Sequence, residues 1–327
     1  MAETKAPENM TAQEYEYMLA KKKKKESKWI TFQHQIPLYC MMLPGIAYMV
    51  CNNYLPMYGI LIAFKKVNYS IGVFKSPWVG LENFEYLFTT KDAYIMVRNT
   101  LAYNLVWIAM GLCISLTIAI FMSEIAERKI AKLIQPVICF PSMISAVILS
   151  YLVYGFLSQS NGFMNRVVFS NREPINWYSS PQYWPFILTI VHFWQSSGQS
   201  SIIYMAAISG VDKTLYEAAK IDGARKMQQI FKITLPMIRH MIILLMLMRV
   251  GSIFGSDFGL FYQVTLNSGM LYSTTQTIDT YVYRALLELN NVGMSSAASV
   301  FQAIIGFCLV ILSNAIVRKV DSDSALF

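Results

Sequence analysis

The feature that most limits the fold of this chain is a set of long stretches without any charged side chain. A helix needs about 20 mostly apolar residues, each adding about 1.5 Å, to cross a lipid bilayer. Five stretches of this 327-residue chain are long enough, and they run from Lys28 to Lys65, Arg98 to Glu124, Lys132 to Arg166, Glu173 to Asp212, and Glu288 to Arg318.

The composition agrees with a chain that is dissolved mainly in lipid. Hydrophobic residues make up 55% of the sequence and charged residues 14%, whereas charged residues make up about 25% of a soluble globular domain. Such a chain has too few polar side chains for a soluble enzyme or a disordered protein. Stretches such as LVWIAMGLCISLTIAIFM lack the alternation of a membrane β-barrel. The sequence therefore predicts an all-α, polytopic membrane protein.

Six transmembrane helices are predicted, preceded by a tail over residues 1–30 and together forming one transmembrane domain over 31–327. Only the fifth predicted helix carries charge in its middle. In the first, Asn52, Asn53 and Pro56 interrupt the apolar pattern, so we expect Met57 to Phe64 at the outer membrane interface. The six helices are placed near 36–58, 99–122, 133–157, 184–208, 238–262 and 296–317.

The distribution of basic residues predicts that both termini are cytoplasmic. With that orientation, 18 of the 27 Lys and Arg residues lie in inner segments and 8 in outer segments, with Arg249 inside the fifth helix. This is the bias expected of cytoplasmic loops. The Lys-rich tail lacks the apolar core of a cleavable signal peptide. The net charge of +8 is thus explained by orientation, and no nucleic-acid partner is expected.

The connection at 211–240, between the fourth and fifth predicted helices, is too polar to cross the membrane. Asp212 is a predicted N-cap, and KTLYEAAKI after it has good helix propensity with its apolar residues on one side. Gly223 can take the left-handed conformation that ends such a helix. We expect a second short helix over 224–233, and then Pro236 in the first turn of the fifth transmembrane helix. An ordinary amphipathic surface helix is the simpler alternative.

The order of residues in this connection resembles the EAA loop of ABC importer membrane subunits. Two positions differ from many relatives, with Val211-Asp212 in place of Ile-Pro, and His240 in place of a proline. Segments such as SPWVGLENFEYLF and IDTYVYRALL further resemble the carbohydrate permeases that serve oligosaccharides and polysaccharide fragments. The matching loop residues are Glu217, Ala218, Ala219, Asp222, Gly223, Ala224, Ile233, Leu235 and Pro236.

The resemblance implies a type I ABC importer permease in the bacterial cell membrane, whose EAA loop couples it to an ATPase. Its implied partners are a second homologous permease, two subunits that bind ATP and Mg, and an extracellular solute-binding protein. The sequence lacks the GxxxxGK[ST] phosphate loop, so we expect a transport subunit that is not itself an enzyme and holds no cofactor.

The solute implied by the resemblance is a sugar, most simply an oligosaccharide. The alternatives are an ABC permease for another solute, such as a glycerol-phosphate or an acidic saccharide, and a secondary transporter. A secondary transporter usually shows internal repeats with interrupted helices in matching halves, and the sequence shows no such duplication.

Polar residues inside the predicted helices indicate the solute path. Arg249, Ser252, Ser256 and Asp257 recur at i, i+3, i+7 and i+8, which places them on one face of a continuous fifth helix. An arginine in mid-membrane costs about 2.5 to 3.5 kcal/mol on insertion scales, so it should face the protein interior. The alternative is that Arg249 pairs with Asp257 or with a neighbouring helix as structural support.

Two other predicted helices carry comparable polar faces. Amides and hydroxyls can bind sugar hydroxyls and aromatic rings can stack on sugar rings, although hydrogen bonding between helices is the competing explanation. If Arg249 lines the path, an acidic sugar becomes more attractive, because a guanidinium binds a carboxylate through two hydrogen bonds. No metal site is expected. The candidate residues are Asn104 and Trp107 in the second helix, with Gly111 and Ser115, and His192, Gln195, Ser196 and Gln199 in the fourth.

Overall fold

The structure is a computed structural model, and it describes residues 35–125 and 131–320. Within these ranges the chain is helical, and its only β pairing is an isolated antiparallel bridge between Lys65 and Trp78. The predicted all-α class is therefore confirmed. The predicted tail over residues 1–30 lies outside the described residues.

The chain divides into two compact units, Met1–Ile60 and Leu61–Phe327. In the first unit an α-helix over 35–49 continues into a π-helix, η1 (Val50–Tyr54), and then into a 3₁₀-helix, η2 (Leu55–Phe64), whose last residues belong to the second unit. Asn52, Asn53 and Pro56 thus change the winding of the helix without ending it.

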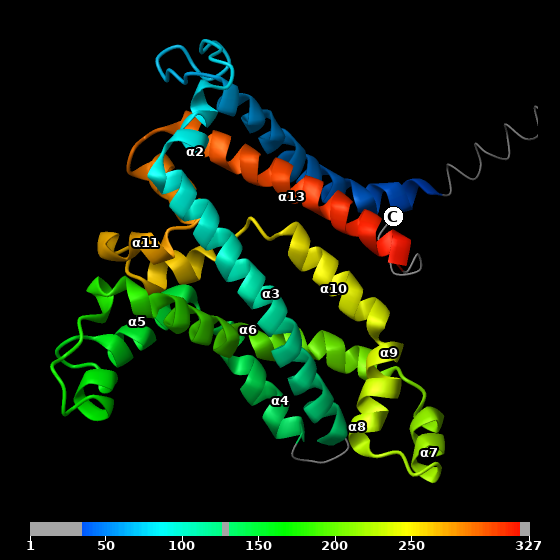
Figure 1. The fold of residues 1–327 in the computed structure, drawn as a ribbon. Coiled ribbons are helices and arrows are strands. Elements are labelled where there is room, and N and C mark those ends of the chain that lie inside the picture. The colour runs from blue at the N-terminus through cyan, green and yellow to red at the C-terminus, as the bar shows by residue number, and fades with distance from the viewer. Residues whose placement is uncertain (1–34, 126–130, 321–327) are drawn as a thin grey trace, which may run out of the picture. The chain divides into compact units, whose positions relative to one another are not determined.

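The second unit contains the remaining elements, coloured from cyan to red in Figure 1. Its α-helices are α2 (Tyr86–Thr89), α3 (Lys91–Ile125), α4 (Ala131–Cys139), α5 (Ala146–Leu157), α6 (Trp184–Ser209), α7 (Lys213–Ile221), α8 (Lys226–Gln229), α9 (Leu235–Met237), α10 (Arg239–Gly251), α11 (Tyr272–Thr275), α12 (Ile278–Leu287) and α13 (Val292–Val320). Its short 3₁₀ and π elements are η3 (Glu82–Phe84), η4 (Phe140–Met143), η5 (Met164–Val168), η6 (Trp177–Ser179), η7 (Pro181–Tyr183), η8 (Ile230–Thr234), η9 (Gly259–Val264) and η10 (Gly269–Leu271).

Three helices of the described residues are long and apolar enough to cross a membrane, namely Gln35–Phe64, Lys91–Ile125 and Val292–Lys319. Two pairs of shorter helices, each bent at a break, raise the number to five if each pair is one span. The predicted arrangement of six spans adds α6, which has 26 residues and polar side chains through its centre. The count of six remains a prediction.

The third span is not the single helix predicted over 133–157. Leu133–Met143 and Ala146–Leu157 are bent by 95° relative to each other. Pro141 lies in the first turn of η4 and has no N–H to continue the preceding helix. Ser145 is extended and caps α5 by accepting a hydrogen bond from the Ile148 N–H at 3.4 Å. The prediction of one continuous helix gave too little weight to Pro141 and Ser145.

The predicted continuous fifth helix over 238–262 is also wrong. Helix α10 ends at Gly251, and no regular helix resumes until the turn that leads into η9. Gly251 lies against α13, because a Cβ there would come within 2.6 Å of Val310 Cγ2. Pro236 lies in α9, which precedes a 64° bend into α10, and not in the first turn of the long helix.

Helices α4 and α6 pack closely at Gly198. A Cβ at this position would lie 2.1 Å from Ile138 O and 2.7 Å from Ile138 C, and backbone atoms cannot move aside as a side chain can. Glycine at this position therefore permits the close approach of the two helices.

We expect Gly198→Ala to lower the thermal stability of the detergent-solubilised protein. Overpacking of a well-packed site costs about 1 to 3 kcal/mol, more than the advantage of alanine in a helix. The matched control is Gly155→Ala in α5, where a Cβ meets no atom within 4 Å. Equal melting temperatures for the two variants would contradict the close approach.

Candidate coupling loop and solute cavity

The connection at 211–240 begins with the helix that its sequence predicts. Helix α7 covers KTLYEAAKI, and Asp212 accepts a hydrogen bond from the Thr214 N–H at 2.9 Å. Hydrogen bonds from the backbone and side chain of Thr214 lower the pKa of Asp212. Because the folded pKa is the lower one, the stabilising effect is present above the unfolded pKa and is lost as the pH falls through the folded value.

The end of α7 is set by Gly223, as predicted. Gly223 has a φ of +76°, a conformation that L-residues with a side chain rarely adopt. Its N–H donates to Lys220 O at 3.1 Å, and the Ala224 N–H donates to Ala219 O at 2.8 Å. These bonds satisfy the carbonyls at the helix end. The turn fixes the direction in which the chain leaves α7.

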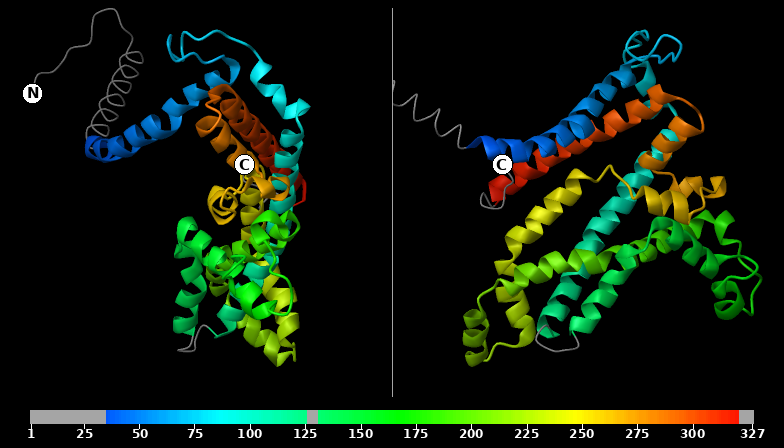
Figure 2. Two further views of the ribbon diagram at one scale, coloured as in Figure 1. Left: turned by 90° about the vertical axis from the view of Figure 1, so that its left-hand side faces the viewer. Right: turned by 180° about the vertical axis from the view of Figure 1, so that it is seen from behind.

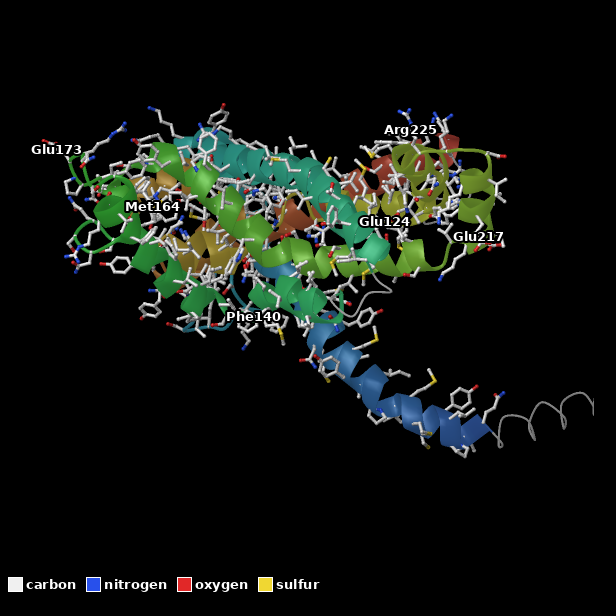
Figure 3. All side chains as sticks on the ribbon, turned by 90° about the horizontal axis from the view of Figure 1, so that it is seen from below. Glu124, Phe140, Met164, Glu173, Glu217 and Arg225 are labelled. Carbon is white, nitrogen blue, oxygen red and sulfur yellow. The ribbon has the colours of Figure 1, made fainter. Side chains whose placement is uncertain are left out.

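The surface of α7 is open to a partner. Glu217 and Ala218 are exposed, and Ile221, an apolar side chain, is 87% exposed. Figure 2 shows α7 to α9 at one end of the second unit. In Figure 3, Glu217 and Arg225 lie at that end, and Met164 and Glu173 of the connection between α5 and α6 lie at the opposite end. The two connections therefore lie on opposite sides of the helices that join them.

Contacts from the loop reach two of the long helices. The Tyr216 hydroxyl and Thr234 Oγ1 are 2.9 Å apart, which joins α7 to η8. Lys226 Nζ lies 2.5 Å from Glu124 Oε2 at the end of α3. This ion pair is exposed and therefore adds little stability, but it shows that α8 lies beside the end of α3. Movement of α7 would thus be passed to η8 through Tyr216, and from there to α3 through α8 and to α10 through α9.

A cavity of about 850 Å³, open solvent included, lies between α3, α6 and α10. Its walls mix polar and apolar groups, as is usual for a small-molecule site. The polar and aromatic residues that line it are Asn104, Trp107, Ser115, His192, Phe193, Ser196, Ser197, Ser200, Tyr204, Arg249 and Ser252.

The structure brings eight of the twelve predicted path residues together at this cavity, namely Asn104, Trp107, Gly111, Ser115, His192, Ser196, Arg249 and Ser252. Gln195 does not line it, and its Nε2 donates to Ile144 O at 3.1 Å across the interface with the third span. Gln199, Ser256 and Asp257 are also absent from the lining. Because α10 ends at Gly251, the last two cannot continue the polar stripe of Arg249.

Three lining residues of α6 that carry a hydroxyl group were not predicted, namely Ser197, Ser200 and Tyr204. A signal for Ser200 exists, because His192, Ser196 and Ser200 follow at i, i+4 and i+8 and so share one helix face. The predicted face grouped His192 with Gln195 and Gln199, each of which lies one residue before a serine that lines the cavity.

Two of the lining residues make contacts that restrict what they can offer a solute. Trp107 is 7% exposed and stacks on His192, with ring centroids 3.8 Å apart and planes at 7°. Asn104 Nδ2 donates to the carbonyl oxygens of Ile253 at 2.9 Å and Gly255 at 2.7 Å. These contacts favour packing and helix support for Trp107 and for the Asn104 N–H groups.

Arg249 supplies the positive charge of the cavity. No ion pair joins Arg249 to Asp257 or to another acidic residue within 35–125 and 131–320. Asp257 Oδ1 instead accepts a hydrogen bond from the Leu260 N–H at 3.0 Å and caps η9. The structure therefore contradicts the alternative in which Arg249 pairs with Asp257.

Sequence relatives share nearly the whole length of the chain. The polygalacturonan/rhamnogalacturonan transport system permease protein YteP of Bacillus subtilis (strain 168) is 33% identical over 307 residues, which cover 94% of this chain and 95% of the relative. Protein LplB of the same organism is 30% identical over 300 residues, with 91% of each chain covered.

A solved structure has the same fold. In the crystal structure of a bacterial ABC transporter involved in the import of the acidic polysaccharide alginate, one chain is 29% identical, with a TM-score of 0.81 over 90% of this chain and 99% of that chain. The model of the family described as binding-protein-dependent transport system inner membrane component matches residues 92–322. The chain belongs to this family of membrane transport permeases.

Proposed function

We propose that this permease forms half of the solute path of an ATP-driven importer in a bacterial cell membrane. A second homologous permease supplies the other half, two ATP-binding subunits hydrolyse ATP, and an extracellular binding protein delivers the solute. Six transmembrane helices with both termini in the cytoplasm place the connection at 211–240 on the side of the ATP-binding subunits.

The observation that carries this proposal is the exposed helix α7 with Glu217 on its surface. It is capped at both ends, it projects from one end of the second unit, and it contacts the rest of that unit through Tyr216 and, by way of α8, Lys226. A docked motor subunit can therefore move it as a rigid element. Coupling of this kind requires two states of the permease that nucleotide and solute favour differently.

We further propose that Glu217, Ala218, Ala219, Asp222, Gly223, Ala224, Leu235 and Pro236 make up the coupling element. Small residues at 218 and 219 let a partner groove approach closely, and Glu217 offers a carboxylate to a basic group. Gly223 and the bend after Pro236 set the angle between the docked helix and α10.

The solute proposed is an oligosaccharide. The cavity presents serine and tyrosine side chains of α6 and the Asn104 amide beside apolar walls, which suits the hydroxyls and faces of sugar rings. An acidic saccharide is favoured by Arg249, which brings a guanidinium to the cavity without an acidic partner among the described residues. A relative is named for polygalacturonan transport, and a solved neighbour imports an acidic polysaccharide.

We expect the chain to co-purify with an ATPase encoded by a neighbouring gene. Vesicles reconstituted with the purified complex should accumulate radiolabelled trigalacturonate only when ATP is enclosed with the ATPase and the binding protein is supplied on the other side. Uptake driven by a proton or sodium gradient, with no ATPase present, would instead identify a secondary transporter.

A further inference from the structure

The segment that follows α10 leaves helical geometry beside the cavity. Where a helix ends in apolar surroundings, backbone groups that a continuous helix would pair need other partners, and each unpaired group costs several kcal/mol in lipid. Four such groups come from consecutive residues, namely the carbonyls of Ile253, Phe254 and Gly255 and the N–H of Ser256. All four have side-chain partners.

These partners come from three separate helices. Asn104 of α3 donates to Ile253 O and Gly255 O, at 2.9 and 2.7 Å. Gln302 of α13 donates from Nε2 to Phe254 O at 2.7 Å. Asp279 of α12 accepts at Oδ2 from the Ser256 N–H at 2.5 Å and from the Ser256 hydroxyl at 2.7 Å.

The partners are also joined to one another. Gln302 Nε2 donates to Asp279 Oδ1 at 3.2 Å, so the carboxylate accepts three hydrogen bonds. Hydrogen-bonded side chains that are also joined to one another hold the backbone between them in place. The network holds the chain just after Arg249 and Ser252, which both line the cavity.

We infer that Asp279, with Asn104 and Gln302, clamps the segment Ser252–Ser256 and thereby positions the Arg249 end of α10 at the solute cavity. Asp279 is a positioning residue, because it touches the segment and does not line the cavity. On this account specific side chains hold the non-helical segment that follows α10 in one conformation. The consequence for transport rests on the proposed function.

Cysteine labelling tests the position of the segment without any solute. The assembled importer is reconstituted with its five native cysteines, Cys40, Cys51, Cys113, Cys139 and Cys308, replaced by serine. One reporter is Ser252→Cys, at the clamped segment, and the matched reporter is Ser200→Cys, which lines the same cavity from α6. The rate of reaction with a water-soluble maleimide is measured for each.

Asp279→Asn is the test substitution, because it keeps the size of the side chain but turns one acceptor into a donor that faces the donors of Gln302 or Ser256. We expect the maleimide rate to change by about threefold or more at the Ser252→Cys reporter, as for the loss of one or two hydrogen bonds. The rate at the Ser200→Cys reporter should stay the same. Asp92→Asn, an exposed aspartate in the first turn of α3, should change neither rate.

Equal rates with and without Asp279→Asn would overturn the inference. A similar change at both reporters would overturn it too, because the effect would then not be local. If Asp279→Asn does not reach the membrane, Gln302→Leu takes its place, since it removes the contact with Phe254 O and leaves the carboxylate, and the same criteria apply.

Transport supplies a second readout. With trigalacturonate as the probe, Asp279→Asn should raise the KM for uptake while the ATPase rate of the complex is retained, since a purely structural defect would lower both activities. A complex that proves not to be driven by ATP would refute the proposed function, but the labelling result would still decide whether Asp279 holds the segment. The two failures are therefore distinguishable.

Discussion

Replacing Glu217 with alanine is expected to lower solute uptake by about tenfold or more while the permease still inserts into the membrane at normal levels. Glu217 lies on the exposed surface of α7, so the substitution removes no internal contact on which folding depends. If its carboxylate pairs with a basic group of the ATP-binding subunit, losing one partner of a charged pair at an interface costs about 2 kcal/mol or more. Uptake should then fall by about tenfold or more.

The measurement compares uptake with ATP hydrolysis in the same reconstituted vesicles. The basal rate of ATP hydrolysis should persist, because the ATP-binding subunits themselves are unchanged. The stimulation of hydrolysis by the loaded binding protein should be lost, because that signal reaches the ATP-binding subunits through α7. The matched control is Glu173→Ala, an exposed glutamate at the opposite end of the second unit. Unchanged uptake by Glu217→Ala at normal expression would refute the coupling role.

Helix positions that depend on local composition could be predicted closely from the sequence. The prediction of 184–208 agrees with α6 at Trp184–Ser209, and KTLYEAAKI is α7 residue for residue. Capping by Asp212 and the left-handed Gly223 are also local, since each depends on residues a few positions away. The residue types within each of these short segments are sufficient to determine where its helix begins and ends.

The bend of the third span and the end of α10 differ in this respect. Hydropathy sums the composition of a window and shows neither of them, but Pro141 and Ser145 are local signals for the bend of the third span. The fifth span opens where Asn104, Asp279 and Gln302 satisfy its backbone. These residues are far from the break in sequence, so their effect belongs to tertiary structure.

This difference explains which candidate path residues meet at the cavity. Arg249 lies in α10 and Ser252 is the residue that caps its end, and both line the cavity. Ser256 and Asp257 follow the break, where one binds Asp279 and the other caps η9. Helical periodicity assigned all four to one face because it assumed that the helix continues.

Replacing Arg249 with methionine is expected to separate the recognition of charge from the rest of transport. Methionine retains an unbranched chain of similar length and removes the guanidinium. A hydrogen bond to a charged group is worth about 1.5 to 3 kcal/mol, so uptake of trigalacturonate at low concentration should fall by about tenfold to a hundredfold. Uptake of its fully methyl-esterified form, which has the same rings without the charge, should stay within about twofold of wild type.

Each solute is compared between variant and wild type with the same binding protein, so the preference of the binding protein for one solute cancels in the ratio. Arg249→Lys should fall between wild type and Arg249→Met for the charged solute, because an ammonium group retains the charge but cannot form the paired hydrogen bonds of a guanidinium. Equal losses for the two solutes would mean that Arg249 supports the structure of α10 and does not recognise the carboxylate. A loss confined to the charged solute would identify it as the residue that selects an acidic saccharide.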